Sequence, residues 1–274
     1  MKLNDLLATQ FVLPSVPKVV ALLLSELGRD DPDLKKINQF ISTDPALTTR
    51  LLQTANSGDF KLAGKINSVS ESLAVLHLAQ VRAMVQTAAA AASLKAIPGI
   101  QLQSFWTYSL NVARSSRSLA GLVRQNQQAA FTSGLLHAMG ELALHLGMPQ
   151  ESAQLDNQMP VLDLLRAKLE QQTFGFCYAQ VGAGFARRWG LPESIVDAIE
   201  HQDAPFEGAV YEPLAGVIHL AVWRARAKEA NFSANVLAVT FPGEVGDVLG
   251  LDIDMVLQQD PIDWPTLAPL RKPS

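Results

Sequence analysis

The 274-residue sequence has few of the features that mark secreted or nucleic-acid-binding proteins. Its single cysteine, Cys177, permits no internal disulfide bond, and we expect that thiol to be buried and unreactive. Charged residues make up only 18% of the chain, and 26 acidic residues outnumber the 22 lysines and arginines. The resulting net charge of −4 argues against nucleic-acid binding, because phosphate contacts need a positively charged surface.

Long hydrophobic runs are also missing. Asp5 interrupts the N-terminal region, so we expect no signal peptide. The most membrane-like stretch, residues 83–94, lies between Arg82 and Lys95, and its twelve residues are too few to cross a bilayer. We therefore expect a cytoplasmic protein that does not enter a membrane.

The common short catalytic motifs are not found. The sequence contains no GxGxxG fingerprint, no Walker loop, no HExxH pair and no GxSxG nucleophile elbow. Gly182 and Gly184 stand within a helical pattern, so we interpret them as sites of close helix packing rather than as a phosphate-binding loop.

Apolar residues at helical spacing run along most of the chain, and strand patterns are scarce. Asp31-Pro32 and Asp44-Pro45 each predict a helix start, since a capping carboxylate precedes a first-turn proline. Residues 236–239 are the one candidate strand, within a proline-containing tail that we expect to lie across the surface. Further helices are predicted over residues 17–28, 46–55, 102–124, 127–146, 158–171, 174–189, 192–202 and 211–229. The sequence therefore predicts an all-α fold.

Pro98-Gly99 is the clearest internal boundary, because both residues interrupt helices. We predict a helical lobe over residues 12–97 and a second helical lobe over residues 100–229. Residues 230–274 are then a C-terminal extension.

Several short motifs follow one another in a characteristic order. The first lobe contains Leu13-Pro14-Ser15-Val16-Pro17, Asp44-Pro45-Ala46-Leu47 and Ala55-Asn56-Ser57, and the second contains Trp106-x-x-Ser109, Gly134-Leu135-Leu136-His137, Val181-Gly182-Ala183 and Trp189-Gly190-Leu191-Pro192. Over about residues 12–225 this set resembles the HDOD domain, a helical output module of bacterial signalling proteins that is related to the HD phosphohydrolases. The resemblance implies a two-lobed fold whose second lobe is similar to those enzymes.

The resemblance also implies where a metal site would lie. Catalytic HD proteins hold metal ions with an adjacent His-Asp pair, further histidines and a late aspartate, because such side chains can replace water around a divalent cation. In this sequence His137 is followed by Ala138 instead of aspartate. The upstream and downstream histidine positions match Tyr108 and Tyr178, while His201 is retained.

The helix expected to carry the late aspartate has no acidic residue between Pro213 and Lys228, although His219 lies on it. We expect His137 and His201 to be neutral imidazoles that are hydrogen-bonded by backbone carbonyls or tyrosine hydroxyls, and His219 to bond a neighbour within the bundle. A residual zinc or nickel site formed by the histidines is the alternative. We expect no metal and no cofactor at this vestigial pocket, which comprises Tyr108, His137, Ala138, Tyr178, His201 and His219.

We therefore expect a non-catalytic signalling module that binds other signalling proteins, while homodimer formation stays open. The candidate partner surface contains Asp44, Asn56, Ser57 and Phe60, because polar side chains and an aromatic ring lie together around a turn. The structural alternative is that Asp44 caps a helix, Asn56 and Ser57 end it, and Phe60 enters the core. Two other functions stay open: a metal-dependent phosphohydrolase acting on nucleotides, and a nucleotide sensor without turnover.

Overall fold

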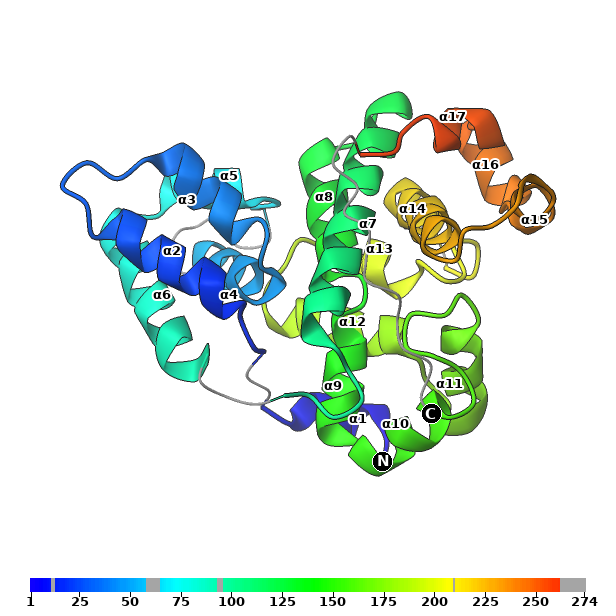
Figure 1. Ribbon diagram of the computed structural model, residues 1–274, viewed down its shortest axis with the longest axis horizontal. Coiled ribbons are helices and arrows are strands. Elements are labelled where there is room, and N and C mark those ends of the chain that lie inside the picture. Colours follow the sequence, from blue (N-terminus) through cyan, green and yellow to red (C-terminus); the bar gives the residue numbers. More distant parts are fainter. Residues whose placement is uncertain (11–12, 58–64, 93–95, 209, 262–274) are drawn as a thin grey trace.

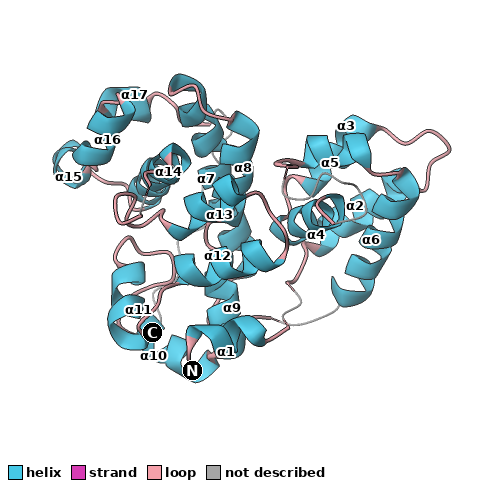
Figure 2. Cartoon of the chain, turned by 180° about the vertical axis from the view of Figure 1, so that it is seen from behind, coloured by secondary structure: helices cyan, strands magenta, loops and turns pink. Residues whose placement is uncertain are grey.

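The computed structural model describes residues 1–10, 13–57, 65–92, 96–208 and 210–261. Every regular element within these ranges is a helix, which confirms the predicted all-α fold (Figure 2). The helices of the first lobe are α2 (Pro17–Leu27), α3 (Leu34–Ile41), α4 (Pro45–Ala55), α5 (Val69–Val75) and α6 (Leu78–Ala92). The second lobe contains α7 (Leu102–Leu122), α8 (Gln127–Leu136), α9 (Met139–Gly147), α10 (Pro149–Asp156), α11 (Arg166–Phe174), α12 (Tyr178–Arg188), α13 (Glu193–Glu200) and α14 (Pro213–Glu229).

The two lobes stand side by side, with the long helix α7 near the middle of the molecule (Figure 1). They share one continuous hydrophobic core, to which α4 contributes Leu51 and Leu52 and α7 contributes Val112. A direct hydrogen bond also joins them, because the Thr132 hydroxyl of α8 donates to the Asn67 carbonyl at 2.7 Å. The N-terminal helix α1 (Leu3–Ala8) packs against α9 and α12 of the second lobe.

Buried Asp44 fixes the start of α4, as its sequence context predicted. One carboxylate oxygen accepts from the Leu47 amide at 2.9 Å, and the other accepts from the Val16 amide at 2.6 Å. Burial raises the pKa of this carboxyl to about 6. The predicted cap at Asp31 is wrong by two residues, because the Asp33 side chain accepts the first-turn amides of α3.

The predicted helix over residues 127–146 is two helices. The carbonyl of His137 accepts from the side-chain Nε2 of Gln202 at 2.8 Å, while the Glu141 amide bonds to the Ala138 carbonyl. The regular i to i−4 ladder is therefore interrupted between α8 and α9. A side chain 65 residues away in the sequence supplies the competing bond, so helical periodicity could not reveal the break.

Two further predictions of secondary structure are wrong. The segment predicted as a helix over 158–171 is irregular up to residue 165, and α10 before it was not predicted. Residues 236–239 belong to a helix, α15 (Ala234–Thr240), instead of a strand. The extension continues with α16 (Gly243–Leu249) and α17 (Ile253–Leu257), and both contact α14 (Figure 1).

An ion-pair cluster is buried in the second lobe, where α9, α10 and α11 meet. The Arg166 guanidinium lies 2.9 Å from carboxylate oxygens of both Glu170 and Asp156, and 3.5 Å from Glu141. Burial and the neighbouring Glu170 raise the pKa of Glu141 well above its usual value. One cation thus ties together α9, α10 and α11. Removing only that cation would take the guanidinium charge away from the buried carboxyl groups of Glu141 and Glu170.

The backbones of α9 and α12 approach each other closely at Gly140, which the sequence did not mark, and at Gly182, which it did. A Cβ atom added to Gly140 would lie 1.9 Å from the Tyr178 carbonyl oxygen and 2.8 Å from the Gly182 nitrogen. A Cβ atom at Gly184 would lie 2.6 Å from the Leu7 side chain of α1. Gly182 and Gly184 are therefore packing residues, as predicted.

None of the described helices meets the length and hydropathy needed to cross a membrane.

We predict that Gly140→Ala will destabilise the protein by about 3 kcal/mol or more, because backbone atoms cannot yield to the added methyl group without separating α9 from α12. Thermal unfolding followed by circular dichroism measures the effect. Gly243→Ala is the control, since a Cβ atom there meets nothing within 4 Å. Equal melting temperatures for the two variants would show that the α9–α12 contact is not tight.

Candidate functional site

The vestigial pocket is a real cavity in the second lobe, with a volume of about 40 Å³. Four of the residues predicted for it line the cavity: Tyr108 from α7, His137 at the end of α8, Tyr178 at the start of α12 and His219 from α14. The remaining lining residues are Leu162, Asp163, Leu164, Gln202, Asp203 and Val222. Helices far apart in sequence thus bring the predicted aromatic and imidazole side chains together.

His137 is held as a neutral imidazole. Its Nδ1 lies 2.7 Å from the Gly134 carbonyl oxygen, which can only accept, so Nδ1 carries the proton. Burial lowers the pKa of the ring to about 4. The tilted ring of Tyr108 lies beside it, with 5.7 Å between ring centroids. In this tautomer Nε2 is an acceptor.

His219 has the same arrangement. Its Nδ1 donates to the Gln202 carbonyl at 2.7 Å, and burial lowers the pKa of the ring. Gln202 is itself buried, and its Nε2 donates to the carbonyls of His137 and Ile199 at 2.8 and 2.9 Å. Its Oε1 has no hydrogen-bond partner. Gln202 therefore connects the two histidines and keeps one unpaired acceptor.

The two tyrosines are protonated phenols. Burial raises the pKa values of Tyr108 and Tyr178 well above the usual value of a phenol. The Tyr108 hydroxyl lies 3.5 Å from the Val222 carbonyl, at the limit of a hydrogen bond. Neither side chain can replace a histidine as a strong metal ligand at neutral pH.

His201 and Ala138 do not line the cavity. His201 is half-buried, its Nδ1 lies 3.1 Å from the Asp197 carbonyl oxygen, and its ring lies beside Gly208. The predicted hydrogen bonds from the histidines to backbone carbonyls are confirmed for His137, His201 and His219. Ala138 is fully buried, as predicted, but it lies at the break between α8 and α9 rather than within one continuous helix.

Three polar residues of the cavity were not predicted: Asp163, Gln202 and Asp203. Asp163 accepts from the Leu165 amide at 3.0 Å, and its other oxygen lies 3.7 Å from Arg226. Gln202 and Asp203 directly follow His201, which was the only sequence signal near them. Asp163 lies in an irregular loop, and nothing in its sequence context marked it.

Cys177 lies next to this region. Its sulfur is 4.0 Å from an Asp203 oxygen, and burial raises the pKa of the thiol to about 12. The thiol is therefore buried, as predicted, and its raised pKa supports the prediction that it is unreactive. The same surroundings raise the pKa of Asp203, through partial burial and repulsion from Glu207.

The residues of this cavity do not fit the metal pair of an HD phosphohydrolase. Ala138, which follows His137 outside the cavity lining, has a methyl group where those enzymes have a carboxylate, and the phenols of Tyr108 and Tyr178 in the lining stay protonated. Across the described ranges, no three histidine, cysteine, aspartate or glutamate side chains are grouped closely enough to hold a metal ion. We derive no metal-dependent step at this site.

The candidate partner surface needs correction. Asp44 and Asn56 are buried, with 0% and 4% of their surface exposed. The Asn56 side chain donates to the Ile66 carbonyl and accepts from the amides of Lys65 and Ile66, while the Ser57 hydroxyl donates to the Thr54 carbonyl. Phe60 lies outside the described residues. Asp44, Asn56 and Ser57 therefore bond within the chain, because each satisfies backbone groups at a helix end.

Comparison with known proteins identifies the fold. A family model described as HDOD domain matches residues 13–205. A protein of Treponema pallidum (strain Nichols), described as uncharacterized, is 24% identical over 212 residues. The match covers 76% of this chain and 41% of that protein, so the chain spans less than half of its relative.

Solved structures share the architecture. The MmoQ response regulator from Methylococcus capsulatus str. Bath has a TM-score of 0.70 and 22% identity, covering 90% of this chain and 97% of that chain. A protein of Shewanella amazonensis SB2B, described as a candidate phosphohydrolase, has a TM-score of 0.55 and 24% identity, covering 94% and 92%. At these identities the likeness shows a common fold.

We predict that His137 makes the protein less stable in acid. The ring has a pKa of about 4 in the folded protein and the ordinary histidine value of 6.5 in the unfolded chain, so between these values the unfolded chain binds more protons. Stability is lost as the pH falls from 6.5 towards 4, by about 3 kcal/mol at 1.36 kcal/mol per pKa unit. Asp44 acts oppositely, because its raised pKa means that the folded state binds protons more readily between pH 6 and 3.8.

The measurement is therefore a comparison of variants. Urea unfolding at several pH values should show a smaller loss between pH 6.5 and 4.5 for His137→Asn than for the wild type, since Asn can still donate to Gly134. His77→Asn, at an exposed site, is the matched control. Identical pH profiles for His137→Asn and the wild type would contradict a buried neutral imidazole.

We predict that Ala138→Asp destabilises the protein by about 2–4 kcal/mol, because a buried carboxylate without a cation must lose its hydration or take up a proton. As a cap on the first turn of α9, the new carboxylate would stabilise the protein by only about 1 kcal/mol. Ala153→Asp, on the exposed face of α10, is the control. If both variants melt at the wild-type temperature at neutral pH, position 138 is solvated.

Proposed function

The chain belongs to the HDOD domain family, and from that premise we propose that it is a non-catalytic signalling module that acts by binding another protein. The observation that carries the proposal is the methyl group of Ala138 beside the retained His137. A folded scaffold can keep its surfaces for recognition after it has lost the groups needed for chemistry. The name of MmoQ, a response regulator of the same fold, is consistent with such a role.

The polar groups of the cavity support this proposal. The imidazoles of His137 and His219 are neutral and oriented by backbone carbonyls, and among the described residues they belong to no group of three or more possible metal ligands. Phosphoester hydrolysis by HD proteins requires metal ions to activate water and stabilise the negative charge that develops. The described side chains offer no equivalent of that Lewis acid.

Two other functions remain as alternatives. The first is a metal-dependent phosphohydrolase acting on nucleotides, and the Shewanella protein of the same fold is described as a candidate phosphohydrolase. The second is nucleotide sensing without turnover. Pockets for small molecules usually have volumes of about 300 Å³ or more, whereas this cavity measures about 40 Å³. A nucleotide could enter only if the surrounding helices separated.

We predict no metal-dependent hydrolysis of nucleotides or of bis(4-nitrophenyl) phosphate by the wild-type protein with Mg²⁺, Mn²⁺, Zn²⁺ or Ni²⁺. Ala138→Asp should also be inactive, because the tyrosines at positions 108 and 178 would still not bind metal and α14 would still have no aspartate ligand. Release of phosphate or nitrophenolate that disappears with a chelator and returns with metal would overturn the proposal. The protein is purified without a histidine tag, so that added metal can act only at its own residues.

A further inference from the structure

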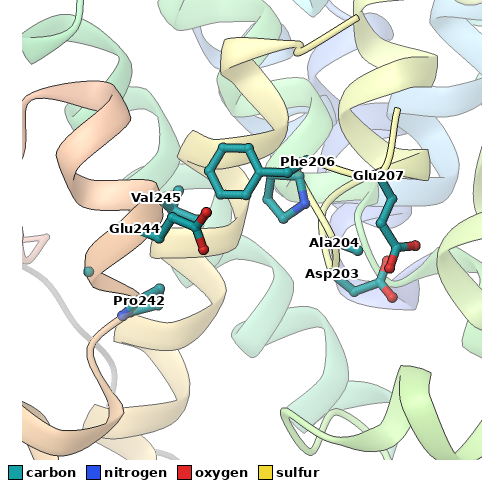
Figure 3. Close-up of a pocket in the computed structure, with 9 residues that line it drawn as sticks. Asp203, Ala204, Phe206, Glu207, Pro242, Glu244 and Val245 are labelled. Atoms are coloured by element: carbon teal, nitrogen blue, oxygen red, sulfur yellow. The ribbon is translucent and has the colours of Figure 1, made fainter. Parts of the chain in front are cut away.

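An open groove adjoins the vestigial pocket. It has a volume of about 470 Å³ and lies between the segment after α13 and the start of α16 (Figure 3). Asp203, Phe206 and Glu207 contribute from the first segment, and Glu244 and Val245 contribute from the second. Asp203 also lines the vestigial pocket, so it stands where the two spaces meet.

The groove is acidic and carries an exposed aromatic ring. Its lining contains the carboxylates of Asp203, Glu207 and Glu244 and no lysine or arginine. Figure 3 shows the Asp203 and Glu207 carboxylates on one side of the groove and Glu244 on the other, near Phe206. Phe206 is 42% exposed and stacks on Tyr211, with 5.4 Å between centroids. Such a surface favours a partner that brings both positive charge and apolar area.

The vestigial pocket behind Asp203 is rich in acceptors. Nδ1 of His137 and Nδ1 of His219 donate to carbonyls, which leaves both Nε2 atoms as acceptors. Gln202, only 2% exposed, adds an Oε1 atom that has no hydrogen-bond partner. A buried polar atom without a partner destabilises the fold, so a donor that entered the pocket and bonded to it would recover that free energy.

We propose that the groove binds a basic segment of a partner protein and that one lysine of this segment passes Asp203 and places its ammonium group in the vestigial pocket. The inference rests on the proposed function, since it names the partner chemistry of a module that acts by binding. The groove holds the apolar and charged neighbours of the lysine against Phe206, Glu207 and Glu244.

The size of the vestigial pocket favours a lysine side chain over an arginine side chain. A cavity needs about 10–15 Å³ to hold a water molecule, so about 40 Å³ accommodates an ammonium group and the end of its stem. The lysine side chain is a compact charge with three donors on a flexible four-carbon stem, whereas the planar arginine fork is wider. Its three donors can bond to acceptors that the cavity lining provides, among them Nε2 of His137, Nε2 of His219 and Oε1 of Gln202, and the carboxylates of Asp163 and Asp203 line the same cavity.

Three degenerate peptide libraries test the proposal. They have the same mixture of flanking residues, including arginine and leucine, and a central lysine, arginine or norleucine. Norleucine has the lysine stem without the ammonium group. By fluorescence anisotropy, the lysine library should bind at least about tenfold more tightly than either of the others, a difference of about 1.4 kcal/mol. Its affinity should fall as salt is added.

Variants locate the binding site. Asp203→Asn and Phe206→Ala, both at exposed positions, should each weaken binding of the lysine library about tenfold. Asp30→Asn, at an exposed position of the first lobe, is the matched control and should bind as the wild type does. Equal affinity for the lysine and norleucine libraries, no binding of the lysine library, or binding that Asp203→Asn leaves unchanged overturns the inference.

The imidazole nitrogens provide a second measurement. Titration with Nα-acetyl-lysine methylamide should shift the ¹⁵N resonances of Nε2 in His137 and His219, while the norleucine analogue should not. If Zn²⁺ alone shifts them and the lysine compound does not, the pocket is a metal site and the inference fails.

The proposed function can survive that failure. In the native host, a partner cross-linked equally by the wild type and by Asp203→Asn would show that binding occurs on another surface. Metal-dependent hydrolysis would instead remove the proposed function itself. The two failures are therefore distinguished by different assays.

Discussion

The contact between the backbones of α9 and α12 is the constraint on which the second lobe depends. No side chain fits at Gly140, where even a methyl group would reach within 1.9 Å of the Tyr178 carbonyl oxygen. Tyr178 is the first residue of α12, and His137 lies two residues before α9 begins. This approach of the two helices therefore also places a phenol and an imidazole at one cavity. The packing of the core and the position of the site thus have one cause.

A second constraint comes from Gln202. Its side chain bonds the His137 carbonyl, and its own carbonyl accepts from His219, so one residue joins the ends of α8 and α13 to α14. The Gly134 carbonyl fixes the tautomer of His137 and the Gln202 carbonyl fixes that of His219, so Nε2 is an acceptor in both rings. In an enzyme of the HD type such nitrogens would bind metal, but here they are acceptors in a cavity that is also lined by the phenols of Tyr108 and Tyr178. The scaffold keeps its order through hydrogen bonds that the protein supplies itself.

The two lobes use buried polar groups in different ways. In the first, Asp44 and Asn56 satisfy the amides and carbonyls of residues distant in the sequence and so hold the chain around α4. In the second, the Gln202 amide leaves one acceptor unpaired and Asp203 faces a groove with other carboxylates. Satisfied groups stabilise the fold, whereas unsatisfied ones create affinity for a donor. The recognition surface that we propose is therefore the segment after α13 instead of the turn after α4.

The sequence alone determined the features that depend on local spacing and residue type. Helical periodicity predicted α2, α4 and α14 within two residues, Asp44-Pro45 marked a helix start, and Ala138 showed that the carboxylate of a metal pair is missing. The break after His137 and the roles of Gln202 and Asp163 were decided by the tertiary structure. Each depends on a hydrogen bond or a cavity formed between segments far apart in the chain. Local patterns contain no information about which distant side chain will compete for a helix carbonyl, so only packing could settle it.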